Sequence, residues 1–126
     1  MNKSNIINLN EFHSGFKSLD QFEFHHTLSE ARGISLVLFF KHSCSSCAYW
    51  RKVLLEYQQN NRHIRLYEVD LEIDPGLAQE FDIFHLPAMQ IYKDGDYYGE
   101  IQCEASQGNI NDCLSKALSR PPQDHP

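Results

Sequence analysis

Hydrophobic residues recur along this chain with two different periods, which predicts that strands and helices alternate. The longest apolar run, "ISLVLFF", lies within residues 34–41 and is continuous, as expected of a strand covered on both faces. Residues 63–70, "HIRLYEVD", are rich in β-formers and predict a second interior strand. Near the C-terminus the apolar positions fall at helical spacing and predict a final helix that contains Ile110, Cys113, Leu114, Ala117 and Leu118.

Turn-forming and capping residues place the remaining elements. A weak first strand is predicted over residues 5–10, followed by a helix from Ser18, which has capping-box spacing with Gln21, to a stop at Gly33. Asp74 is predicted to cap a short helix with a proline at its first position. The other predicted features are a helix over about residues 45–59, a hairpin over residues 88–103 that turns at Asp94-Gly95, and a disordered tail over residues 120–126.

The predicted order of elements is β-α-β-α-β-α-β-β-α. A strand, helix and strand in succession form a right-handed crossover, so residues 34–41 and 63–70 are expected to pair in parallel. The final two strands are expected to form an antiparallel hairpin at the edge of the same sheet. The prediction is therefore an α/β fold with a central mixed sheet and helices on both faces, as a single domain over residues 1–119 followed by the tail.

Composition narrows the classes of function. The chain has 126 residues and a formal net charge of −6, with no Lys/Arg-rich stripe, so nucleic acid and anionic membrane are not expected as partners. The first 15 residues contain no apolar signal segment, which predicts a cytoplasmic protein. In that reducing compartment four cysteines are not expected to form a disulfide scaffold. Redox chemistry, metal binding and packing remain as their possible roles.

Two of the cysteines, Cys44 and Cys47, lie three residues apart where the first interior strand gives way to a helix. At a helix start, unpaired backbone N–H groups and the positive end of the helix dipole stabilise a thiolate and lower its pKa. Cys44 is therefore the predicted nucleophile. Cys47 faces the same way one turn later, is predicted to be more deeply set, and can attack a mixed disulfide to release the substrate.

The stretch over residues 34–118 resembles thioredoxin. After the cysteine pair, the chain reads "VDLEIDPGLAQEFDIFHLPAMQIYKDG", which follows the family pattern without a gap. The matching positions are Val69, Asp70, Pro75, Leu77, Ala78, Phe81, Ile83, Leu86, Pro87, Lys93 and Gly95. The resemblance implies a thioredoxin-like fold, and it implies that the bond before Pro87 is cis, that Pro87 lies beside Cys44, and that the Leu86 backbone is open to a substrate strand.

The same resemblance implies the activity and the partners. A thioredoxin-like oxidoreductase exchanges disulfides with protein substrates and needs no bound organic cofactor. A reductase or glutathione system donates the electrons that reduce it again. We expect a monomer. Two alternatives remain open at this point: a non-catalytic binding or redox-sensing module, and a zinc site built from Cys44, Cys47, Cys103 and either His42 or His85.

Several positions depart from the family pattern around the first cysteine. Ser43 replaces the family's tryptophan, and Ser45-Ser46 replaces its Gly-Pro. Without the proline, the helix start gains one backbone N–H that can donate to the Cys44 thiolate. We therefore expect a lower Cys44 pKa and a less reducing potential than that of thioredoxin itself.

A second departure concerns the proton of Cys47. The family's buried aspartate aligns with Leu38, and the lysine that partners it aligns with Glu68. One interpretation is that the carboxylate has moved to the neighbouring strand, where Glu68 would take the proton. The other is that Glu68 is only a surface acid of its strand.

The remaining candidates surround the substrate groove that the resemblance implies. Cys103 aligns with a glycine of that groove, so it is either a third reactive thiol or a small buried residue. His85 lies beside the groove, and Cys113 and Trp50 are expected in the core.

Overall fold

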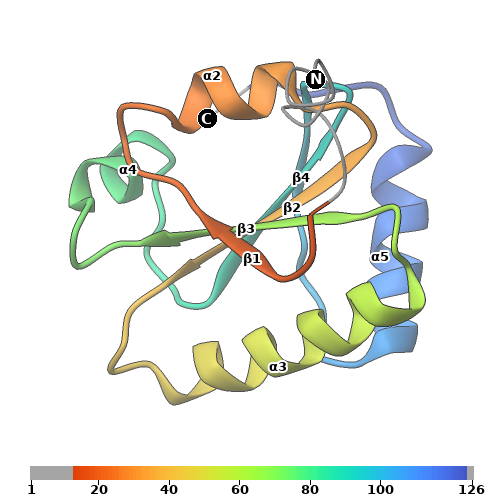
Figure 1. The fold of residues 1–126 in the computed structure, drawn as a ribbon, viewed down its shortest axis with the longest axis horizontal. Coiled ribbons are helices and arrows are strands. Elements are labelled where there is room, and N and C mark those ends of the chain that lie inside the picture. The colour runs from red at the N-terminus through yellow and green to blue at the C-terminus, as the bar shows by residue number, and fades with distance from the viewer. Residues whose placement is uncertain (1–12, 125–126) are drawn as a thin grey trace, which may run out of the picture.

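A five-stranded mixed β-sheet lies between two pairs of helices in the computed structural model, which describes residues 13–124 (Figure 1). The strands stand in the order β1-β3-β2-β4-β5. The elements are β1 (Phe16–Ser18), α2 (Phe24–Glu30), β2 (Ile34–Phe40), α3 (Ser45–Asn60), β3 (Arg65–Asp70), α4 (Pro75–Glu80), β4 (Ala88–Lys93), β5 (Asp96–Glu100) and α5 (Gln107–Leu118).

The pairing of the strands follows the connections between them. β3 lies parallel to β1 and β2, while β4 runs antiparallel to β2 and β5. The helix α3 makes the crossover from β2 to β3, which confirms the predicted parallel pair. The register places Leu38 of β2 directly beside Glu68 of β3. The residues that stand in place of the family's aspartate and lysine are therefore neighbours on adjacent strands.

Alternation along the strands divides the core into two layers. In β2, Leu36 and Leu38 pack in the layer with α3 and α5, whereas Val37 and Phe39 pack in the layer with α2 and α4. All four of these side chains are at most 1% exposed. Burying one such side chain contributes about 1.5–3 kcal/mol. The continuous apolar run therefore reflects a strand with helices on both faces, and Trp50 is buried in the α3/α5 layer as predicted.

The predicted start of the first helix is wrong. Ser18 belongs to β1, where it pairs with Glu68, and the helix begins only at Phe24. Asp20 makes the turn that leads into the helix, because its carboxylate accepts the N–H groups of Phe22 and Glu23. The helix ends at Glu30, before the predicted stop. The predicted strand over residues 5–10 lies outside the described residues.

Two smaller predictions also differ from the structure. Asp74 precedes α4 and Pro75 is its first residue, but the Asp74 side chain makes no capping hydrogen bond. The strand β5 ends at Glu100, so Cys103 lies beyond it in an irregular segment. Residues 121–124 are irregular, and the Gln123 N–H donates to the Tyr97 carbonyl. The division at residue 119 stays a prediction.

Gly95, in the turn between β4 and β5, has a positive φ of 88° and approaches the end of α2 closely. A Cβ at this position would lie 2.5 Å from the Ser29 carbonyl oxygen. We expect Gly95→Ala to destabilise the fold by at least about 2 kcal/mol, from left-handed backbone strain and the displaced backbone. Chemical denaturation measures this loss.

The matched control is Gly108→Ala, because Gly108 lies in α5 and a Cβ there meets nothing within 4 Å. This variant should be neutral or gain about 0.5–1 kcal/mol from helix propensity. Equal stabilities of the two variants would contradict the close approach at Gly95.

Candidate active site

The two cysteines of the C-x-x-C pair are joined by a disulfide at the start of α3. Cys44 is the N-cap residue of this helix, and its Sγ accepts the Cys47 backbone N–H at 3.1 Å. Cys44 is half-buried, whereas Cys47 is only 2% exposed. An incoming sulfur therefore reaches Cys44 first, and the N–H group at the helix start is placed to stabilise negative charge on it.

Ser46 adds a contact that the sequence did not predict. Its hydroxyl lies 3.4 Å from the Cys44 sulfur and donates to it, because a disulfide sulfur carries no proton. A proline at this position has no hydroxyl and no N–H. Ser43 and Ser45 are both exposed. Ser46 thus adds a donor to Cys44 that a proline at this position does not supply.

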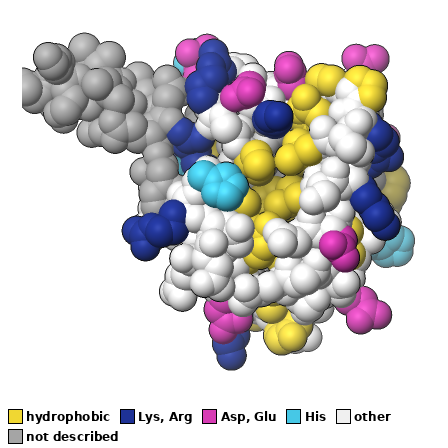
Figure 2. All heavy atoms as spheres, turned by 90° about the vertical axis from the view of Figure 1, so that its right-hand side faces the viewer, with side chains coloured by type: hydrophobic (Ala, Val, Ile, Leu, Met, Phe, Trp, Pro, Cys, Tyr) yellow, Lys and Arg dark blue, Asp and Glu magenta, His cyan; other side chains and the backbone are white. Residues whose placement is uncertain are grey.

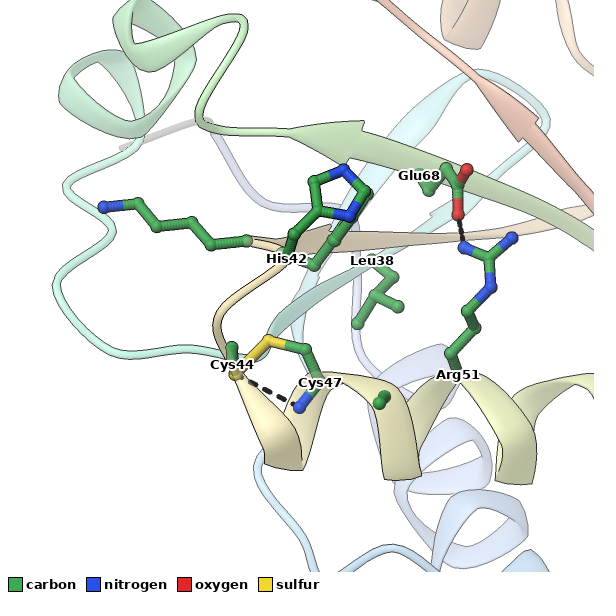
Figure 3. Close-up of a pocket in the computed structure, with 9 residues that line it drawn as sticks. Leu38, His42, Cys44, Cys47, Arg51 and Glu68 are labelled. Atoms are coloured by element: carbon green, nitrogen blue, oxygen red, sulfur yellow. Dashed lines mark hydrogen bonds and ion pairs between the residues drawn. A yellow bond between two sulfur atoms is a disulfide. The ribbon is translucent and has the colours of Figure 1, made fainter.

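A cavity of about 220 Å³ lies behind the pair, between α3 and the sheet (Figure 3). Its lining residues are Leu38, Phe40, Lys41, His42, Cys44, Cys47, Ala48, Arg51 and Glu68. Figure 3 shows Glu68 and Arg51 at the end of this cavity away from Cys44, with the Leu38 side chain between them and the disulfide. The cavity connects the deeper cysteine with one carboxylate.

Glu68 is held by an ion pair. Its carboxylate pairs with the guanidinium of Arg51, which comes from α3 one turn after Cys47, and it accepts a hydrogen bond from the Ser18 hydroxyl at 3.2 Å. The Arg51 guanidinium also lies over the Phe16 ring, 4.7 Å from its centroid. The Glu68 side chain is 13% exposed, unlike a solvated surface acid. Arg51 was missed by sequence reasoning, although its place four residues after Cys47 on one helix is a usable signal.

His42 is hydrogen bonded to two carboxylates. Its Nε2 lies 2.9 Å from an oxygen of Asp70, and its backbone N–H donates to Glu72 at 2.8 Å. The His42 side chain is 73% exposed at the rim of the cavity. Among residues 13–124, His42, Asp70 and Glu72 are the group whose ligand atoms lie close enough together to hold a metal ion.

The predicted groove residues gather at a second site. His85, Pro87 and Cys103 line a groove of about 530 Å³ together with Trp50, and the Leu86–Pro87 bond is cis. Leu86 packs against the α2/α4 core layer. Cys103 and His85 thus line a different hollow from Cys44 and Cys47. The residues considered as zinc ligands are therefore divided between the two hollows, with Cys44, Cys47 and His42 in the first and Cys103 and His85 in the second.

Comparison with known proteins decides the family. The thioredoxin family model matches residues 15–116, most of the chain. The chain belongs to the thioredoxin family. Two relatives called thioredoxin, from Chlamydia trachomatis serovar D and Chlamydia muridarum, are each 28% identical over 93 residues, covering 73% of this chain and 86% of the relative. Thioredoxin-family membership and the bridged cysteine pair together indicate thiol-disulfide redox chemistry in general.

Solved structures support the thioredoxin-like fold. Human ERp44 in a zinc-bound form aligns with a TM-score of 0.70 at 18% identity, over 82% of this chain and 30% of that chain. A second structure also aligns, and its title is "Structural basis of the thiol resolving mechanism in yeast mitochondrial 1-Cys peroxiredoxin via glutathione/thioredoxin systems". Its TM-score is 0.69 at 18% identity, over 84% of this chain and 99% of that chain. At these identities the likeness concerns the fold alone. In the part of the chain that the structure describes, every helix is too short or too polar to cross a membrane.

Proposed function

We propose that this protein is a thiol–disulfide oxidoreductase that exchanges disulfides with protein substrates through Cys44 and Cys47. The observation that carries the proposal is the bridge at the start of α3, in which the sulfur of Cys44 accepts a backbone N–H and remains partly exposed while Cys47 is buried. This asymmetry separates an attacking sulfur from a resolving one.

The first step joins the reduced protein to its substrate. The Cys44 thiolate attacks one sulfur of a substrate disulfide, so a Cys44–substrate bond forms and the substrate S–S bond breaks. The leaving thiolate takes a proton from solvent. The Cys47 N–H and the Ser46 hydroxyl hold negative charge on Cys44 before attack.

The second step releases the substrate. Cys47 gives its proton to Glu68 through the cavity they share, and its thiolate attacks the Cys44 sulfur. The bond to the substrate breaks, and the expelled substrate thiolate takes a proton from solvent, while Glu68 later returns its proton to solvent. The substrate thus leaves as a dithiol, with two electrons that came from the cysteine pair. The pocket carboxylate, held by Arg51, supports this role for Glu68.

A groove beside the pair would hold the substrate chain. Pro87 lines this groove together with His85 and Cys103, and Ser43 stands exposed next to Cys44. The backbone of Leu86, which precedes Pro87, would pair with an extended substrate strand. The two sulfurs carry both electrons, so the cycle needs no organic cofactor. A thioredoxin reductase or a glutathione system in the cytoplasm would return the electrons to a monomeric protein.

The potential of the pair is expected to be less reducing than about −270 mV, the value for thioredoxin. The added hydroxyl donor of Ser46 stabilises the reduced form, and stabilising the dithiol makes the pair more oxidising. Equilibration with glutathione buffers, followed by alkylation and trypsin, measures it. Trypsin cleaves after Lys41 and Arg51, so one peptide reports on both cysteines. A value at or below that of thioredoxin would contradict the role given to the serines.

A further inference from the structure

The groove that contains Pro87 lies at the end of the sheet from which the cysteine pair emerges. β4 runs antiparallel to β2, and its first residue, Ala88, pairs with Phe39 near the end of β2 (Figure 1). β2 ends at Phe40, four residues before Cys44. A substrate segment joined to Cys44 therefore has this groove at the same end of the sheet.

The rim of the groove carries a large apolar side chain that the fold does not bury. Phe84, in the segment between α4 and β4, is 83% exposed and lines the groove. Trp50 of α3 and Met89 of β4 line the same hollow and are buried in the core. A single exposed apolar residue is common on a protein surface, but one that lines a concave, partly apolar hollow becomes buried when a chain occupies that hollow. Phe84 thus offers a contact for an apolar side chain of a bound segment.

The charged residues that line the groove are acidic. Asp82 is exposed, and Glu100 at the end of β5 is half-buried. No lysine or arginine is among the described residues that line this groove. Glu100 also borders a hollow that contains Lys116 and Arg120, so we expect Asp82 to contribute more of the negative potential. On the face that carries α5, by contrast, charges of both signs are mixed (Figure 2). The groove therefore favours a basic segment over an acidic one.

We propose that this groove selects substrate segments that carry a bulky apolar residue and a basic residue beside the reactive disulfide. Phe84 contacts the apolar side chain, and Asp82, with a smaller contribution from Glu100, attracts the cation. The inference rests on the proposed function, because the segment is held while Cys44 exchanges with its disulfide. Phe84 and Asp82 are thus specificity-determining residues of that exchange.

The test measures how fast the pre-reduced protein reduces four peptides that differ only beside their cysteine. Each peptide is Gly-X-Cys-Z-Gly, blocked at both ends, with its cysteine disulfide-bonded to mercaptoethanol. X is leucine or serine, and Z is lysine or glutamate. Reduction oxidises the Cys44 and Cys47 thiols to their bridge and releases the peptide and mercaptoethanol as thiols, so the two electrons balance. Acid quenching followed by chromatography gives the second-order rate constant.

Both features of the peptide should raise the rate. We expect the leucine peptides to react about tenfold faster than the serine peptides, from the burial of an apolar side chain. At low ionic strength we expect the lysine peptides to react at least about fivefold faster than the glutamate peptides, from attraction to the groove carboxylates. Salt at about 1 M, with a screening length of about 3 Å, should remove most of the charge preference and leave the leucine preference. Equal rates for the four peptides, or a preference for glutamate, would overturn the proposal.

Substitutions assign each preference to its residue. Phe84→Ser should bring the ratio of leucine to serine rates close to one. Asp82→Asn should lower the ratio of lysine to glutamate rates, and by more than Glu100→Gln does. The matched control is Phe22→Ser, which should keep both ratios, because Phe22 is 86% exposed and is not among the residues that line the groove. A leucine preference that survives Phe84→Ser, or a charge preference that survives Asp82→Asn and Glu100→Gln together, would overturn the assignment.

Failure of this inference is distinguishable from failure of the proposed function. Hydroxyethyl disulfide is small and uncharged, so its reduction by the unsubstituted protein, lost in Cys44→Ser, reports on exchange alone. If the protein reduces hydroxyethyl disulfide and discriminates among no peptides, the exchange activity stands and the selectivity of the groove is overturned.

A binding measurement tests the groove even if no disulfide is reduced. The same peptides with serine in place of cysteine cannot react, and the emission of Trp50, the single tryptophan of the chain, follows their binding. The peptide with leucine and lysine should bind at least about tenfold more tightly than the peptide with serine and glutamate. Equal affinities would overturn the inference. A dimer that Phe84→Ser dissociates would assign the groove to a second copy of the chain and would also overturn it.

Discussion

Replacing Cys47 by serine is expected to convert the protein from a turnover catalyst into a covalent trap. Cys44 remains at the start of α3 and can still attack a substrate disulfide, but no second sulfur is present to displace the substrate. Turnover of insulin disulfides should fall to the background rate, while a mixed disulfide accumulates on Cys44. Non-reducing electrophoresis followed by mass analysis of residues 42–51 detects that adduct.

The matched variant is Cys44→Ser, which retains the buried sulfur and loses the exposed one. Cys47 is only 2% exposed, so this variant should neither turn over nor capture substrate. Equal capture by the two variants would show that the sulfurs have no distinct roles. Turnover by Cys47→Ser at the rate of the unsubstituted protein would show that release does not need the second cysteine.

Substituting the pocket carboxylate is expected to slow release of the substrate and to leave the first attack unchanged. Glu68→Gln keeps the size of the side chain but cannot accept a proton from Cys47. Loss of a positioned base typically costs about 10²–10⁴-fold in rate, and the resolution step should slow by at least about 10²-fold. Rapid mixing and acid quenching of the mixed disulfide separates resolution from attack. Glu56→Gln, on an exposed position of α3, is the control.

Arg51 acts on this step through Glu68. Arg51→Met removes the positive charge that favours the ionised carboxylate, so Glu68 is protonated at higher pH than in the unsubstituted protein. Because only the ionised form takes a proton, the acid limb of the resolution rate should move to higher pH. A uniform drop at every pH would indicate a structural role for Arg51. Resolution rates unaffected by Glu68→Gln would exclude the carboxylate from the proton transfer.

Local patterns in the sequence predicted the elements whose environment is uniform along their length. Residues 36–40 are apolar throughout because both faces of β2 are covered, and α5 shows helical spacing because one side of it packs on the sheet. The helix expected from Ser18 failed because that residue pairs with Glu68 of β3, fifty positions away. A long-range strand pairing outweighs a local capping signal, and the residues next to Ser18 in the sequence do not indicate that pairing.

The site likewise contains features that the sequence predicted and features that it did not. The C-x-x-C spacing and its strand-to-helix junction can be read directly, since both depend on neighbouring residues. The Glu68–Arg51 pair depends on which face β3 turns to α3. Cys113, expected in the core, is half-buried there because it also lines a surface hollow.

The most direct test of the central claim is the rate at which dithiothreitol reduces insulin in the presence of the purified protein. If Cys44 and Cys47 cycle between dithiol and disulfide with a protein substrate, the unsubstituted protein accelerates insulin precipitation in proportion to its concentration, and Cys44→Ser gives the rate of dithiothreitol alone. An unsubstituted protein that leaves that rate unchanged would contradict the assignment of a disulfide-exchange enzyme.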